Sequence, residues 1–252
     1  MTQFWTMLPG DALGARERKA LTLAVALLSV MLTGLVLHSA WFGSLTALIL
    51  RAAFFSLAAA AGLLIVAAQR PAAWMRAALY ALAAAVLIPG PYLWTNYMAI
   101  IRSGGIASDR DVALFMAATL AALVLARFLI GWVMVGLGVL ALAYAFLGAH
   151  IPGDYGHAGY SLGRVTSNLF LRTEGLFGLP MGVAAQYIFL FSLLGTLLLK
   201  TGLGQVFVDL AHALTGRVQG GPALTAVVSS TMFSSINGSA VAGVVTTGTF
   251  TI

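Results

Sequence analysis

Six apolar segments, each about long enough to cross a lipid bilayer, limit what this chain can fold into. A spanning helix needs about 20 mainly apolar residues, and such runs occupy residues 20–37, 45–68, 77–99, 111–127, 129–149 and 181–199. Hydrophobic residues make up 61% of the 252 residues and charged residues only 8%, whereas a soluble domain carries about 25% charged residues. The sequence therefore predicts an all-α integral membrane protein, a polytopic helical bundle surrounded by the lipid bilayer.

Two parts of this pattern need interpretation. The first follows Arg16, Arg18 and Lys19, as in a signal peptide, but it is longer than a signal core and many spans follow it, which favours an uncleaved first span. The run from Val112 to Ala149 is nearly twice the length of a span and holds one charge, Arg127. We interpret it as two short spans joined by a tight turn at Arg127.

The distribution of basic residues predicts the orientation. Loops on the cytoplasmic side are enriched in Lys and Arg. With a cytoplasmic N-terminus, eight fall inside: Arg16, Arg18, Lys19, Arg70, Arg76, Arg127, Lys200 and Arg217. Five fall outside: Arg51, Arg102, Arg110, Arg164 and Arg172. We expect a multi-pass protein of the bacterial inner membrane, with Trp41, Trp74, Tyr92, Trp94 and Tyr97 at the interfaces.

Composition argues against several other classes of function. The net charge of +6 reflects few acidic residues, and the basic residues are scattered, which argues against nucleic acid as a partner. The chain has no cysteine, which removes disulfides, thiol chemistry and cysteine zinc sites. His150, Asp154 and His157 have a spacing that fits a metal site, but an ordinary solvated loop is the favoured interpretation.

The polar stretch from His150 to Pro180 divides the chain into a scaffold, residues 1–149, and the start of a second domain, residues 150–252. Within the stretch, Arg172 and Glu174 are interpreted either as a surface ion pair or as part of a docking or gating surface. Arg51 lies at the edge of a span, where snorkelling to the interface is favoured over a substrate contact.

After the last span, residues 205–215 have apolar positions at helical spacing and predict an amphipathic helix at the membrane interface, with Asp209 and His212 as a local pair. Residues 223–236 then form a run of 14 apolar or hydroxylated residues. As a helix this run is about 21 Å long, too short for a hydrocarbon core of about 30 Å. Asn237-Gly238 is a strong turn signal, so residues 222–252 predict a re-entrant hairpin whose tip is buried in protein or lines a wet cavity.

The hairpin is rich in groups that can bind a cation. Fourteen of the 24 residues from Ser229 to Ile252 are Ser, Thr, Gly or Asn, and none is charged. Hydroxyl and carbonyl oxygens suit an alkali cation, whereas Ca²⁺ and Mg²⁺ usually recruit carboxylates. Close helix packing by small residues is the alternative explanation for Ala240, Gly243 and Gly248.

Three motifs carry a resemblance to a known family: GYSLGRVTSNLFLRTEGLFG (159–178), GRVQGGPA (216–223) and SSINGSAVAGVVTTGTFTI (234–252). With them, the chain resembles the membrane subunit of tripartite ATP-independent periplasmic (TRAP) transporters. The apolar N-terminal extension resembles the fused permeases that work with TAXI-type binding proteins, and this resemblance implies that the first four spans are a fused small subunit that acts as the scaffold. The resemblance covers residues 150–252, and residues 1–149 match in hydropathy alone.

The resemblance implies a sodium-coupled importer of an organic anion, fed by a TAXI-type periplasmic binding protein, with Na⁺ as the coupling ion and no other cofactor. It implies an elevator mechanism and no enzymatic activity. The ion and substrate residues it implies are Ser234, Ser235, Asn237, Gly238, Ser239, Thr246, Thr247 and Gly248. Sodium would be bound by backbone carbonyls near Ser235, Gly238 and Ser239.

This chain departs from the family pattern in two places. Ala242-Gly243-Val244 stands where the family has Ala-Asn-Val, so a ligand or a packing hydrogen bond is missing there. The family also continues past the TFTI motif, and we expect the coding frame to supply the remainder of the permease after Ile252.

Three other functions share some of these sequence features. A divalent-anion symporter that works without a binding protein would also contain a re-entrant hairpin. A passive channel would conduct its substrate without a binding protein. An intramembrane serine hydrolase would need a base within reach of Ser239, but His212 is expected at the interface and the later segments hold no His or Lys.

Overall fold

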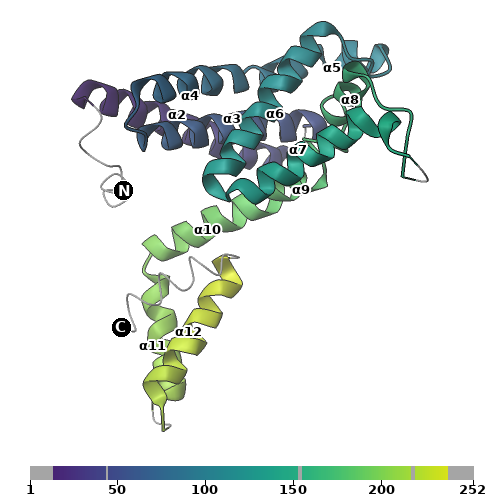
Figure 1. Cartoon of the computed structure of the whole chain (residues 1–252). Helices are drawn as coiled ribbons and strands as arrows, with labels where there is room; N and C mark the ends of the chain where they lie inside the picture. Colours follow the sequence, from purple (N-terminus) through teal and green to yellow (C-terminus); the bar gives the residue numbers. More distant parts are fainter. Residues whose placement is uncertain (1–13, 44, 153–154, 217–218, 238–252) are drawn as a thin grey trace. The chain divides into compact units, whose positions relative to one another are not determined.

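The computed structural model describes residues 14–43, 45–152, 155–216 and 219–237, and every regular element among them is a helix (Figure 1). Within these described residues, six helical segments are long and apolar enough to cross a membrane: Ala15–Phe42, Ala47–Ala68, Ala73–Arg102, Asp109–Leu129, Trp132–His150 and Leu179–Leu198. Each overlaps one of the six predicted spans. The expected polytopic helical membrane protein is therefore confirmed.

Contacts divide the chain into two compact units, Met1–Gly182 and Val183–Ile252. This division reflects which residues pack against one another. The division at residues 149/150 was proposed from the polar stretch that begins at His150, and it stays a prediction.

The first unit is built around α3 (Ala47–Ala68). This helix packs against α2 (Ala15–Phe42), α4 (Ala73–Val86), α5 (Pro89–Arg102) and α6 (Asp109–Leu129). Within its most apolar window, 61% of α3 is buried inside the protein, against 6% for α7 (Trp132–Leu147) and η1 (Gly148–His150) together. The alanines that repeat along α3, such as Ala52, Ala60 and Ala67, are fully buried and let neighbouring helices approach closely.

The third predicted span is two helices rather than one. α4 ends at Val86, and α5 begins at Pro89 after a turn at Leu87 and Ile88. Proline has no backbone N–H and fits only the first turn of a helix, which explains the break. Gly90 follows it, and its N–H donates to Ser56 Oγ at 3.0 Å.

The turn between the fourth and fifth spans lies at Gly131, so the prediction of a turn at Arg127 is wrong. Gly131 has φ of 123°, a conformation that glycine adopts without strain. Arg127 stays in the last turn of α6, and its Cζ lies 4.3 Å from the centre of the Trp132 ring. The arginine is held by this cation–π contact.

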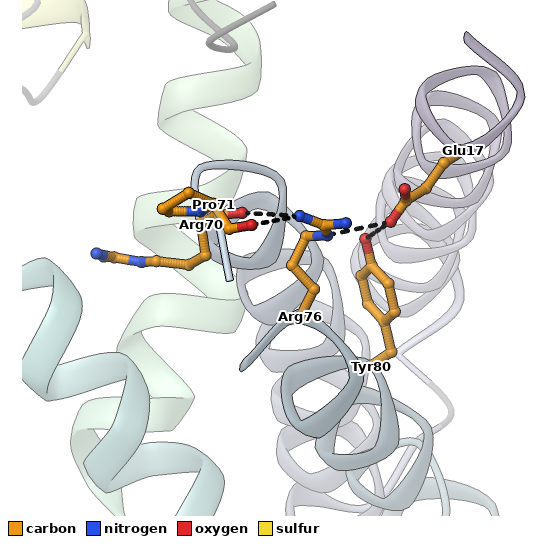
Figure 2. Close-up of polar contacts among 5 residues, drawn as sticks. All are labelled: Glu17, Arg70, Pro71, Arg76 and Tyr80. Atoms are coloured by element: carbon orange, nitrogen blue, oxygen red, sulfur yellow. Dashed lines mark hydrogen bonds and ion pairs between the residues drawn. The ribbon is translucent and has the colours of Figure 1, made fainter. Parts of the chain in front are cut away.

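Polar contacts fasten one end of the first unit, which we call the Glu17 end (Figure 2). Arg76 Nε lies 3.3 Å from Glu17 Oε1, and the Tyr80 hydroxyl donates to the same oxygen at 3.0 Å. Arg76 also donates to the carbonyl of Pro71 at 2.9 Å. Arg70 lies with Cζ 4.2 Å from the centre of the Phe128 ring. These contacts bring the start of α2, the α3–α4 connection and the end of α6 together.

The opposite end, which we call the Arg51 end, holds the α5–α6 connection and the polar stretch before the second unit. Ser108 and Asp111 form a capping box at the start of α6. The Ala107 N–H donates to Ser167 Oγ at 2.9 Å, which ties this connection to α8 (Leu162–Leu169). α9 (Leu179–Val183) follows.

The second unit begins within α9 and continues as a π-helical turn, η2 (Ala184–Ile188), and α10 (Phe189–Lys200). α11 (Leu203–Thr215) and α12 (Gly221–Asn237) follow, and α10, α11 and α12 pack on one another. α11 starts two residues before the predicted helix, directly after Gly202, whose φ is 84°. Placement of α11 at the membrane interface stays a prediction.

Candidate functional site

The first arm of the proposed hairpin is a helix. α12 has 17 residues, Gly221–Asn237, which corresponds to a length of about 25 Å. It is longer than the predicted 223–236 but still shorter than a hydrocarbon core of about 30 Å. Pro222 lies in its first turn, as predicted. A helix of this length that ends in Ser-Ser-Ile-Asn fits the first arm of a re-entrant hairpin.

Buried hydroxyl groups join α11 to α12. Thr215 Oγ1 lies 2.7 Å from Thr225 Oγ1, and both side chains are buried. Each hydroxyl also contacts a carbonyl of its own helix, that of Ala211 for Thr215 and that of Gly221 for Thr225. Ser229, one turn beyond Thr225, is also fully buried. The hydroxyls on this side of α12 therefore serve helix packing.

The predicted ion residues fall at the end of α12 and beyond it. Ser234 is half-buried, and Ser235 is exposed, with its hydroxyl donating to the carbonyl of Met232 at 2.7 Å. Asn237 is the last residue of α12. The other predicted residues, Gly238, Ser239, Thr246, Thr247 and Gly248, lie outside the described residues, as do Ala240 and Gly243.

The final turn of α12 has the chemistry that a cation site needs. The last four carbonyls of an α-helix have no partner within the helix, and the helix dipole places partial negative charge at that end. In α12 these carbonyls belong to residues 234–237. Ser234 and Ser235 are therefore in a turn whose carbonyl oxygens point along the helix axis toward its C-terminal end.

α11 shows a different polar contact from the one predicted. Asp209 Oδ1 accepts a hydrogen bond from Gln205 Nε2 at 3.1 Å, a contact between residues one helical turn apart. Asp209 and His212 form no ion pair with each other. The expected pairing of Asp209 with His212 is therefore wrong, because Gln205, four residues before Asp209, donates a hydrogen bond to the carboxylate.

The segment from Leu169 to Gly178, which we call the 169–178 loop, packs closely into the first unit. Phe170 and Phe177 are fully buried with ring centres 5.5 Å apart. Phe177 also meets Phe55 of α3 edge-on at 6.0 Å. A Cβ added at Gly175 would lie 2.3 Å from Leu169 Cα, so only glycine fits. Most of the TEGLFG motif is therefore explained by packing.

Arg51 holds this loop against α3. Arg51 Nη1 donates to the carbonyl of Phe177 at 3.1 Å, and a Cβ at Gly182 would lie 2.7 Å from Arg51 Nε. Its guanidinium thus binds the backbone of another segment, 126 residues away in sequence, and the snorkelling of Arg51 to the interface stays a prediction.

The exposed part of the same loop is charged. Arg172, Thr173 and Glu174 are exposed, and Arg172 and Glu174 form no ion pair with each other. Of the two interpretations of this pair, the surface ion pair is therefore wrong. The loop presents these side chains on a fixed backbone at the Arg51 end.

His157 stabilises the polar stretch. Its Nε2 lies 3.1 Å from the carbonyl of Tyr144, and its Nδ1 accepts from the N–H of Gly159 at 3.1 Å. The ring stacks on Tyr160 at 4.8 Å. Both ring nitrogens are used in these contacts, and among the described residues no group of His, Asp or Glu could hold a metal ion. Asp154 lies outside the described residues.

A family model describes the second half of the chain. The model of the DctM component of tripartite ATP-independent periplasmic transporters matches residues 117–252, which is more than half of the chain. The chain belongs to this family. No curated protein and no solved structure matches it.

The DctM match includes the 169–178 loop, the α11–α12 pair and every predicted ion residue. The protein is therefore a membrane component of a TRAP transporter, a system that also contains a periplasmic binding protein and a small membrane subunit. Members of this family are components of transporters rather than enzymes.

Sequence reasoning missed two features. The first is the Arg51–Phe177 contact, which joins a residue upstream of the DctM match to one within it. The sequence feature that could have indicated this contact is a single arginine near the start of an apolar helix. The Thr215–Thr225 contact was also missed, although Thr225 and Ser229 are one helical turn apart and mark a polar stripe.

Proposed function

We propose that this DctM-family chain imports an organic carboxylate together with Na⁺, after delivery by a TAXI-type periplasmic binding protein. The observation that carries the proposal is α12, a helix too short to span the bilayer that ends in a hydroxyl-rich turn within the DctM match. In secondary transporters such discontinuous helices bind coupling ions and anionic substrates near the middle of the bilayer.

The proposed sodium site begins in the last turn of α12. Ser234, Ser235 and Asn237 supply carbonyl oxygens at the negative end of the helix dipole, and Gly238 and Ser239 continue the site beyond the helix. Thr246, Thr247 and Gly248 belong to the segment that returns. No carboxylate lies among these residues, which favours Na⁺ over Ca²⁺ or Mg²⁺.

The first unit is proposed to act as the scaffold and the second unit as the start of an elevator-type transport domain. α3 is the most buried spanning helix, and Arg51 joins it to the 169–178 loop. In this arrangement the scaffold holds the family-matched loop in place, while the transport domain carries the ion and the carboxylate.

A cytoplasmic N-terminus is the orientation that the charges favour. Arg16, Arg18, Lys19, Arg70, Arg76 and Arg127 all belong to the helix ends and connections at the Glu17 end. The positive-inside rule then places the Arg51 end in the periplasm, with exposed Arg172 and Glu174 available to the binding protein.

Cysteine labelling tests this orientation, because the chain has no cysteine of its own. Ile106→Cys, which is 76% exposed at the Arg51 end, should react with a membrane-impermeant maleimide in intact spheroplasts. Gln69→Cys, exposed at the Glu17 end, should react only after permeabilisation. The reverse pattern would contradict the proposed orientation.

Transport is tested with the complete gene product in proteoliposomes, using the purified binding protein and the carboxylate identified on it by mass spectrometry. Uptake should require the binding protein and an inward sodium gradient. Asn237→Ala and Ser239→Ala should raise the sodium concentration needed for half-maximal uptake. Thr231→Ala is the matched control, since Thr231 is exposed on α12 and its hydroxyl donates to the carbonyl of Val227.

Two results would reject parts of the proposal. An unchanged sodium requirement in both variants would remove the side chains of Asn237 and Ser239 from the ion site. Uptake that needs neither binding protein nor sodium would favour a passive channel, and sodium-driven uptake without the binding protein would favour a simple symporter.

A further inference from the structure

An apolar groove of about 810 Å³ lies between α2, α3 and α5 in the first unit. Its walls include Leu28, Met31 and Leu35 from α2 and Pro91 and Trp94 from α5. Gly34 on α2 widens it, because a Cβ there would meet no atom within 4 Å, whereas Gly90 lets α5 approach α3 closely, since a Cβ there would lie 3.0 Å from Ala53 Cα. The groove lies upstream of the DctM match.

The groove exists because α2 has few neighbours. Its main packing partner is α3, and Glu17 ties its first turn to α4. The α4–α5 break lies beside the groove, since Leu87 and Gly90 line it. Toward the Arg51 end, α2 and α5 therefore leave a space that none of the described helices of the first unit fills.

The groove has the depth of one bilayer leaflet. On α2 its walls run from Leu28 to His38, which at 1.5 Å per residue is about 15 Å along the helix axis. A hydrocarbon core of about 30 Å has leaflets of half that thickness. On α3 the walls run from near its start, at Leu45, to Leu57 in its middle. The groove therefore reaches from the Arg51 end to about the bilayer centre.

The surface around the groove is typical of contact with lipid. Trp41, near the end of α2, is 86% exposed, and Trp94 at the groove is 50% exposed. Exposed tryptophans near the ends of spanning helices are typical of the membrane interface. Of the most apolar window of α2, only 17% is buried inside the protein. These features favour lipid over another protein segment as the occupant.

We propose that this groove binds one phospholipid from the leaflet at the Arg51 end, with an acyl chain lying between α2 and α5. Within a bilayer, association depends on van der Waals packing rather than on exclusion of water. A chain in the groove touches three helices at once, so it gains more dispersion contacts than a chain on a flat helix surface. His38 and Trp94 lie in the groove wall, and their ring N–H groups can donate to the phosphate or ester oxygens.

Filling the groove tests the proposal. In Gly34→Leu the new side chain enters the groove, and a Cβ at Gly34 meets no atom within 4 Å. The matched control is Gly136→Leu, because Gly136 on α7 is equally open and lies outside the groove. Each protein is purified in mild detergent, supplied with synthetic phosphatidylethanolamine, and analysed by native mass spectrometry.

The unmodified protein and Gly136→Leu should each retain one more phospholipid per chain than Gly34→Leu after the same detergent wash. Equal retention by all three proteins would overturn the proposal. Equal melting temperatures of the two variants would show that any difference comes from the groove and not from misfolding.

A second measurement separates lipid from a protein segment. Met31→Cys places the only cysteine of the chain in the groove wall. After attachment of a benzophenone maleimide in native membranes, illumination should add the mass of a phospholipid. A crosslink to a peptide would show that a protein segment covers the groove, and would overturn the proposal.

Discussion

Replacement of Phe177 by alanine should destabilise the first unit strongly. The side chain is fully buried, meets Phe55 edge-on at 6.0 Å, and lies 5.5 Å from Phe170. Removal of a buried phenylalanine costs about 3–5 kcal/mol. For a unit of this size, each kcal/mol lowers the melting temperature by about 2–4 °C, so Phe177→Ala should melt about 6–20 °C lower.

Phe146→Ala is the matched control. Phe146 lies on α7 and is 38% exposed, so lipid or detergent can replace much of its contact surface. The measurement is thermal unfolding followed by tryptophan fluorescence. This signal reports on the first unit, because its described part contains Trp41, Trp74, Trp94 and Trp132 and the later residues contain no tryptophan.

The double-mutant cycle of Phe55→Leu and Phe177→Leu measures the contact itself. An edge-on aromatic pair contributes about 0.5–1.5 kcal/mol beyond its buried area, which should appear as the coupling energy of the cycle. If Phe177→Ala lowers the melting temperature no more than Phe146→Ala, or if the two leucine substitutions are additive, α3 and the 169–178 loop do not share one core.

Two further substitutions test the packing of the DctM-matched region. Gly175→Ala should destabilise the first unit by about 2 kcal/mol or more. Gly163→Ala, on an open face of α8, should be neutral or stabilising. Thermal unfolding should therefore show a lower melting temperature for Gly175→Ala and an equal or higher one for Gly163→Ala. Thr225→Val should weaken the contact with Thr215 by about 0.6 kcal/mol, so amide hydrogen exchange in α11 and α12 should become about threefold faster. Thr231→Val, on the exposed side of α12, should leave the exchange unchanged.

The sequence was sufficient to predict the class of fold and the spans, because a bilayer demands long apolar segments and satisfied backbone groups. The breaks within spans were harder to place. Arg127 was the only charge in its run and was taken for the turn, but a long cationic side chain can stay helical and reach a nearby ring. Gly131 was the better signal for the position of the turn, because the residue there has a φ of 123°, which glycine adopts without strain.

Contacts between distant segments were not predictable from local patterns. Arg51 follows the general expectation for a charged residue near a helix end, but the carbonyl it binds belongs to Phe177. A motif such as TEGLFG indicates the family without telling which of its residues are packed and which are presented. The structure separates them: Gly175 and Phe177 belong to the core, whereas Arg172 and Glu174 are exposed.

The boundary of the family match and the boundary of the folded unit differ, and the difference has a physical consequence. The DctM match begins at residue 117, inside α6, whereas the first compact unit extends to Gly182. Residues before the match therefore supply α3, the buried centre of this unit, and Arg51, which binds the matched 169–178 loop. A loop that Arg51 and Phe55 fasten to α3 cannot move without breaking these contacts. The N-terminal helices are for this reason part of the structure that holds the matched loop in place, and variants of Arg51 or Phe55 should affect a transport step that depends on this loop.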